Sequence, residues 1–166
     1  NVAIVHGDCE SLAGWGLSSE ALAVAAHRAK VGNWFTEAAV DVIASSHSCL
    51  PVLMNIATAK GTGIVINNGA AGMPNFAGAQ HGLITRIGVR PSPHPPLYGT
   101  SLGAVHVAAL AVHYALQRCR DDFNANCPPG SAAHPSSSRL LETGPRYHPG
   151  TPCPLTAQPP PPTTPL

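Results

Sequence analysis

Apolar residues near the start of the chain fall into two short runs that each stop just before a histidine. Residues 2–5 (VAIV) end at His6, and residues 40–44 (VDVIA) are followed by two serines and His47. Short runs rich in β-branched side chains are typical of strands buried in a parallel sheet. The pattern therefore predicts two strands, with a histidine just beyond each carboxyl end.

The segment between these runs has the pattern of a helical connection. Ser18 and Ser19 are candidate N-terminal caps for an alanine-rich helix over residues 20–30, which Gly32 can end. Asn33 can cap a second, shorter helix before the next strand. A strand, a helical crossover and a second strand form a βαβ unit, whose strands run parallel.

The parallel arrangement has a geometric consequence for the two histidines. Parallel strands end at one edge of their sheet, so we expect His6 and His47 to lie at that edge together. Open α/β sheets bind their ligands at the carboxyl ends of the strands. The functional site is expected at this edge.

The rest of the apolar pattern predicts further strands and one more helix. Residues 52–56 and 63–67 flank a glycine-containing turn and predict a hairpin. Residues 82–89 form another strand candidate. Alternating apolar residues from position 103 favour a strand to about Tyr114, followed by a helix to about Phe123. Together these elements predict an α/β fold.

The composition changes at Pro128. Residues 145–166 contain nine of the eighteen prolines of the chain and end in PPPPTTPL. Such a sequence has too little apolar surface to fold onto a core. We therefore expect one folded domain over residues 1–127 and a Pro-rich, disordered tail over residues 128–166.

Overall composition narrows the classes of partner. The chain is 44% apolar and 10% charged, with a formal charge of +1, so nothing indicates binding to nucleic acid. No apolar run reaches the length of a membrane span. Five cysteines without a framework spacing indicate free thiols in a reducing, cytoplasmic compartment. Because the chain starts inside a predicted strand and without methionine, we expect an N-terminal portion to be missing.

Four residues beyond the two strands are candidate metal ligands: His6, Asp8, His47 and Cys49. Imidazole, carboxylate and thiolate are the ligand types that bind Zn, Mn or Fe, and strand ends hold such groups rigidly. Two alternatives stay open. Cys9 and Cys49 with the two histidines have the ligand types of a structural zinc, and either cysteine with a histidine base has those of a nucleophilic thiol.

A later loop is a candidate for binding phosphate. Asn67, Asn68 and Gly69 open a stretch of small residues, which let backbone N–H groups approach an anion. The loop contains neither G-x-G-x-x-G nor the Walker pattern. The sequence thus predicts a phosphate contact without a nucleotide-binding motif.

These motifs together resemble the C-terminal portion of the calcineurin-like metallophosphoesterase superfamily. The features that carry the resemblance are the His6-Gly7 pair after the first strand, the segment His47-Ser48-Cys49-Leu50-Pro51 after the second, the hairpin and the Asn67-Asn68-Gly69 loop. The resemblance covers residues 3 to about 75. It implies part of a two-sheet αββα sandwich whose N-terminal half is missing.

The resemblance also implies a function and a division of the site residues. His6 and His47 would bind one metal of a dinuclear centre, and Cys49, where the family has histidine, would bind the other. The family's Asp-x-His, Gly-Asp-x-x-Asp and Gly-Asn-His motifs would precede His6 and are not in this chain. We therefore expect at most one divalent ion here and assign no catalytic residue.

The intact parent protein would hydrolyse phosphomonoesters or phosphodiesters, and this chain would be inactive alone. The alternative is a non-catalytic metal-binding or interaction domain with a degenerate site. The substrate and the oligomeric state are not readable from the sequence.

Overall fold

The predicted strand–helix–strand unit opens the fold. The computed structural model describes residues 1–145. The unit consists of β1 (Val2–Ile4), α1 (Ser19–Ala23), α2 (Ala25–Ala38) and β2 (Val42–Ser45). β1 pairs in parallel with β2, with Val2 opposite Val42. The parallel βαβ arrangement is thus confirmed.

The break between the two helices differs from the expected one. Ser18 caps α1 by accepting a hydrogen bond from the backbone of Ala21, as predicted, but the chain leaves the helix at Val24. Gly32 lies inside α2 instead of ending it. The helix passes so close to the carbonyl oxygen of Ala57 at this position that no side chain fits there. The sequence pattern identified the glycine but not its role in packing.

The predicted hairpin completes the first sheet. It is formed by β3 (Pro51–Thr58) and β4 (Gly61–Asn68), which pair antiparallel. β4 also runs parallel to β2, which gives the strand order β1-β2-β4-β3. The carboxyl ends of three parallel strands therefore share one edge.

A second, antiparallel sheet follows in the chain. Its strands are β5 (His81–Gly88), β6 (Tyr98–Leu102) and β7 (Val105–His113), in the order β5-β7-β6. The predictions of β5 and β7 are confirmed, whereas β6 was not predicted. α3 (Leu116–Asn126) comes after β7, close to its predicted position.

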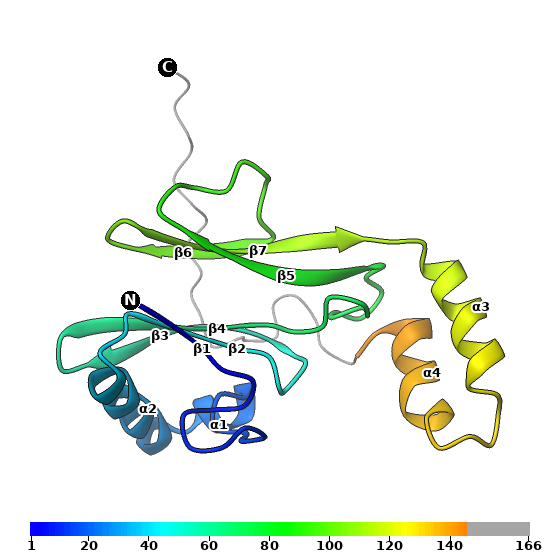
Figure 1. The fold of residues 1–166 in the computed structure, drawn as a ribbon, viewed down its shortest axis with the longest axis horizontal. Coiled ribbons are helices and arrows are strands. Elements are labelled where there is room, and N and C mark those ends of the chain that lie inside the picture. Colours follow the sequence, from blue (N-terminus) through cyan, green and yellow to red (C-terminus); the bar gives the residue numbers. More distant parts are fainter. Residues whose placement is uncertain (146–166) are drawn as a thin grey trace.

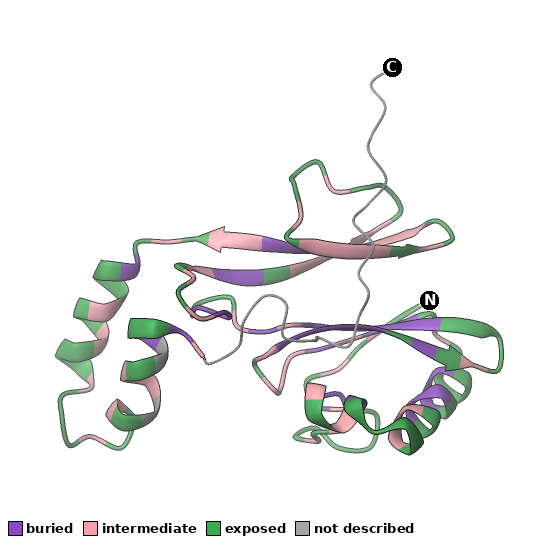
Figure 2. Ribbon diagram, turned by 180° about the vertical axis from the view of Figure 1, so that it is seen from behind, coloured by how far each residue is buried: buried purple, intermediate pink, exposed green. Residues whose placement is uncertain are grey.

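The two sheets face one another, and α1 and α2 cover the other side of the first sheet (Figure 1). One apolar cluster lies between α2 and the first sheet and includes Val31, Phe35 and Ile56. A second cluster lies between the sheets and includes Ile64 and Val107. Figure 2 shows that buried residues concentrate in the first sheet and on the side of α2 that faces it. The molecule is a mixed α/β structure with two sheets.

The last described element lies within the segment predicted to be disordered. Residues His134–Thr143 form α4, which packs beside α3 at one end of the molecule (Figure 1). Arg120 of α3 donates hydrogen bonds to the carbonyl oxygens of Leu141 and Glu142. The expected disorder therefore does not hold for α4, and residues 146–166 of the predicted tail lie outside the described residues. In the described part of the chain, no helix has the length and apolar character needed to span a membrane.

Candidate functional site

The structure brings His6 and His47 together at the carboxyl edge of the first sheet. The backbone carbonyl of His6 accepts hydrogen bonds from the N–H groups of Ser46 (3.1 Å) and His47 (2.7 Å), which extends the contact between β1 and β2. Nε2 of His6 lies 3.0 Å from Nδ1 of His47, and the ring centroids are 4.8 Å apart. Backbone pairing thus places the two imidazoles in direct contact.

Ser46 holds the ring of His6 from the other side. Its Oγ lies 3.1 Å from Nδ1 of His6. When this nitrogen carries the proton and donates to Ser46, Nε2 of His6 is left with a lone pair that faces His47. Metal-bound histidines usually have this arrangement, because a hydrogen bond at one nitrogen fixes the ring for binding through the other.

An aromatic side chain lies beside the histidine pair. The ring of Trp15 is 5.0 Å from that of His47, centroid to centroid, and packs edge-on against it. Trp15 remains 60% exposed. It belongs to the loop between β1 and α1, so the conformation of this loop determines the surroundings of His47.

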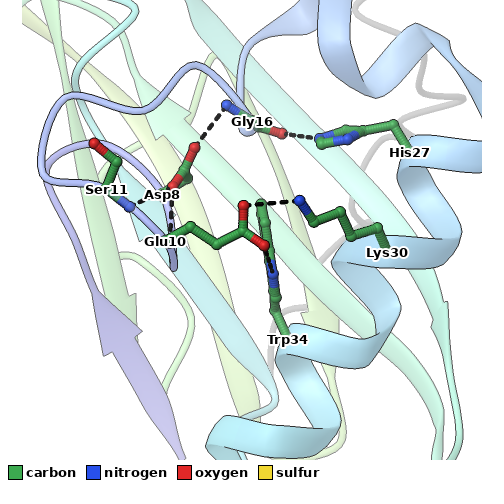
Figure 3. Close-up of polar contacts among 7 residues, drawn as sticks. All are labelled: Asp8, Glu10, Ser11, Gly16, His27, Lys30 and Trp34. Carbon is green, nitrogen blue, oxygen red and sulfur yellow. Dashed lines mark hydrogen bonds and ion pairs between the residues drawn. The ribbon is translucent and has the colours of Figure 1, made fainter.

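Asp8 organises that loop (Figure 3). One carboxylate oxygen accepts hydrogen bonds from the backbone N–H groups of Glu10 and Ser11, each at 2.8 Å, and the other accepts from Gly16 at 2.9 Å. Partial burial raises the pKa of Asp8, but the three backbone donors and the charge of Lys30 together lower it below its ordinary value. Both carboxylate oxygens are therefore engaged within the loop.

The loop is also fastened to α2 (Figure 3). The carboxylate of Glu10 lies 2.7 Å from the Lys30 ammonium and accepts from Trp34 Nε1 at 3.4 Å. Nε2 of His27 lies 2.7 Å from the carbonyl oxygen of Gly16. The sequence did not predict that His27 and Trp34 hold this loop, since their partners come from a segment whose path was not predictable. The site is thus connected to the crossover helix.

Cys49 lies two residues after His47 and has a left-handed backbone conformation. Its φ is +52°, and its thiol lies 3.6 Å from the carbonyl oxygen of His47.

At Cys9, partial desolvation and then the charges of Asp8, Glu10 and Glu37 raise the pKa of the thiol. A raised pKa disfavours the thiolate, which is the form that attacks substrates or binds zinc.

The ligand set that the structure assembles is smaller than the predicted one. Within residues 1–145, no group of three or more histidine, cysteine or acidic side chains is placed to hold a metal ion. Of the four predicted ligands, His6 and His47 lie in direct contact with each other. Asp8 binds the loop backbone, and metal binding by Asp8 and Cys49 stays a prediction.

The side chain of Asn67 connects the ends of two neighbouring strands. It is buried, with Nδ2 3.2 Å from Ser45 Oγ and 3.0 Å from Ser48 Oγ, while Oδ1 accepts a hydrogen bond from the Gly69 backbone. Asn68 donates to the carbonyl oxygens of Gly69 and Leu83. Binding of phosphate by this loop stays a prediction and would require these groups to exchange their protein partners.

Asn75 was not singled out in the sequence, yet it closes the same loop. Its amide is buried, donates to the carbonyl oxygens of Ala70 and Met73, and accepts from the Ala70 backbone. Gly69 has a φ of +70°, and a side chain there would run into Asn75. The loop is therefore internally fixed.

Comparison with known proteins leaves the site to be interpreted from its own geometry. No family model, no curated protein and no solved structure matches the chain.

Proposed function

We propose that His6 and His47 form one side of a binding site for a divalent metal ion. The observation that carries the proposal is the contact between Nε2 of His6 and Nδ1 of His47, 3.0 Å apart at the ends of adjacent parallel strands. Two nitrogens bound at about 2.0–2.1 Å to a tetrahedral ion lie roughly 3.3 Å from one another. The pair is thus already spaced much as an ion would require.

The donor chemistry supports this assignment. The nitrogen–nitrogen contact needs a proton on one of the two rings, whereas a metal ion needs a lone pair on both. Binding of an ion would replace that proton, so affinity should fall at acid pH. Imidazole nitrogen suits Zn and Fe better than Mn, which prefers oxygen ligands.

Two imidazoles are an incomplete ligand set. Zinc sites usually have three or four protein ligands, and residues 1–145 contain no third histidine, cysteine or acidic side chain placed beside this pair. We infer that the described chain holds at most one ion at this edge, with water in the remaining positions. Further protein ligands would have to come from elsewhere.

We propose that the complete site hydrolyses phosphate esters. Support comes from the resemblance of the strand-end motifs to calcineurin-like metallophosphoesterases and from the mixed α/β architecture with two facing sheets. In such a site the bound metal polarises the phosphoryl oxygen and lowers the pKa of water. His6 and His47 would position the ion, and Ser46 would hold the ring of His6.

A second candidate is a metal-binding domain without catalysis. It is favoured by the lack of a third ligand beside the pair in residues 1–145, and by the use of Asp8 as a structural group of the loop. The coding sequence upstream of Asn1 separates the two candidates. Asp-x-His and Gly-Asp-x-x-Asp motifs there would support hydrolysis, and a complete reading frame without them would support the non-catalytic domain.

Calorimetric titration with Zn²⁺ tests the metal site. We expect His47→Ala to remove one binding event, because the remaining imidazole is a single ligand, while His94→Ala, which alters an exposed loop histidine, should not change it. An unchanged binding isotherm for His47→Ala would overturn the assignment. Hydrolysis of p-nitrophenyl phosphate with Mn²⁺ by this chain alone would contradict the claim that the site is incomplete.

A further inference from the structure

A second pair of histidines lies on the other sheet. His81 begins β5 and His113 ends β7, and the register places the two residues directly opposite one another. Their ring centroids are 5.7 Å apart, with the planes inclined by 53°. Opposite residues of an antiparallel pair have Cβ atoms about 4.5–5.5 Å apart, so both imidazoles can reach one ion.

The pair lies at the end of the face that the second sheet turns toward the first. Because side chains alternate along a strand, His81 shares its face with Leu83, which is fully buried. The backbone N–H of Leu83 donates to the carbonyl oxygen of Ala70 at 2.9 Å, which fixes the start of β5. His113 is exposed, so an ion would reach the pair from solvent.

One nitrogen of this pair lacks a partner. Nε2 of His81 is buried and makes no hydrogen bond to any described residue. A buried polar atom left without a partner destabilises the folded state, so a ligand for it would stabilise the fold.

We propose that His81 and His113 form a second binding site for a divalent transition-metal ion such as Zn²⁺. The two imidazoles would hold the ion, Nε2 of His81 being one ligand, and water would fill the other positions. Since residues 1–145 offer no third histidine, cysteine or acidic ligand there, the ion would be exchangeable. The site would select Zn²⁺ or Cu²⁺ over Mn²⁺, following the general order of affinities. This proposal does not depend on the function proposed for His6 and His47.

Titration of the His47→Ala variant with Zn²⁺ tests the proposal, because the first site is then removed. We expect this variant to bind one zinc ion. In the same background His113→Ala should weaken binding by at least about tenfold, as loss of a ligand does, and His94→Ala should leave it unchanged. His113 is the better position for the test because its side chain is exposed and its loss leaves no cavity.

An independent readout locates the ion. In a long-range ¹H–¹⁵N spectrum the Nε2 signal of His81 should shift on addition of Zn²⁺, and His81→Gln should abolish the binding while thermal unfolding verifies that the variant folds. Failure of the His47→Ala variant to bind zinc would overturn the proposal, as would binding that leaves the His81 signal unshifted or that survives His113→Ala.

Discussion

Single polar residues at the edge of the first sheet serve two different purposes. Asp8 and Asn67 use their side chains to bind nearby backbone and hydroxyl groups, which fixes the loops. His6 and His47 instead contact each other. This division explains why ligand types near a strand end do not by themselves identify ligands.

The structural role of Asp8 can be tested by Asp8→Asn. In asparagine an amide nitrogen replaces one carboxylate oxygen and cannot accept a hydrogen bond. Either the bond from Gly16 or those from Glu10 and Ser11 would therefore be lost. We expect the free energy of unfolding in urea to fall by about 1–3 kcal/mol. Asp41→Asn, at an exposed aspartate beside the chain start, is the control for loss of a surface carboxylate. Equal stability of Asp8→Asn and wild type would contradict the role.

The same carboxylate should make stability depend on pH. Because the pKa of Asp8 is lowered on folding, its contribution is complete above the ordinary value of 3.8. The contribution is lost as pH falls from there through the lower folded-state pKa. In thermal unfolding between pH 5 and pH 2, wild type should therefore lose more stability than Asp8→Asn. Parallel curves for the two proteins would refute this.

At the scale of elements, the position of α2 on the sheet depends on one glycine. A Cβ at Gly32 would collide with the carbonyl oxygen of Ala57, a backbone atom of β3 that cannot rotate away. Val31 and Phe35 on either side of it are buried against the same strand pair. The close approach lets the helix bury these apolar side chains.

Gly32→Ala should therefore destabilise the protein although alanine is the better helix former. Overpacking against β3 is expected to outweigh the propensity gain, with a net loss of about 1–3 kcal/mol measured by urea unfolding. Gly72→Ala is the matched control, because an added Cβ meets nothing within 4 Å there. A stabilised Gly32→Ala variant would show that the helix can move away freely.

At the end of α2 a substitution to glycine should stabilise the protein. Ala39 follows the helix with a φ of +52°, a left-handed conformation in which an L-residue is strained by roughly 1–2 kcal/mol. Ala39→Gly relieves this strain against a smaller entropy cost, so we expect stabilisation by about 0.5–1 kcal/mol. Ala29→Gly inside α2 should instead destabilise by about 1 kcal/mol. The urea midpoints of both variants provide the comparison.

Elements with a clear local pattern were predictable, and those defined by distant contacts were not. The apolar runs at residues 2–5 and 40–44 form β1 and β2. They were predictable because β-branched strands joined by a helical segment are recognisable from the local sequence. β6 was missed because its strand pairing with β7 outweighs the weak strand pattern of its glycine, serine and threonine residues. α4 was missed because it is stabilised by contacts with α3.

At the scale of the molecule, α3 and α4 form a helical pair that stands beside the two sheets (Figure 1). Arg120 joins them through bonds of 2.8 Å and 2.6 Å to carbonyl oxygens near the end of α4. Hydrogen bonds to a charged donor are among the stronger ones in proteins. Arg120 is thus one of the contacts that hold α4, beside the hydrogen bond from the Gly78 N–H to the carbonyl oxygen of Thr143 and the stacking of His134 on Phe123.

Arg120→Ala should release α4 without unfolding the sheets. We expect faster amide hydrogen exchange in α4 and unchanged exchange in β4, because local openings need not involve the core. Arg118→Ala is the control. Within residues 1–145 the ion pair of Arg118 is an exposed one within α3, with Asp122 at 3.8 Å. Protection of α4 equal to that of wild type would contradict the role of Arg120.

The candidate site was predictable as far as strand order determines it. Parallel pairing of β1 and β2 brings His6 and His47 to one edge, and this followed from the pattern of the sequence. The hydrogen bonds that Asp8 accepts from the backbone depend on the path of a glycine-rich loop. The orientation of Cys49 depends on a left-handed backbone conformation. Neither feature has a local signal in the sequence.

The structure of crystals soaked in Zn²⁺, with anomalous diffraction recorded at the zinc edge, tests the central claim most directly. We predict an anomalous peak bound by Nε2 of His6 and Nδ1 of His47, each at about 2.0–2.1 Å. Ser46 should keep its contact with Nδ1 of His6. A zinc-soaked structure in which the two imidazoles still contact each other directly, with no anomalous peak beside them, would contradict the account.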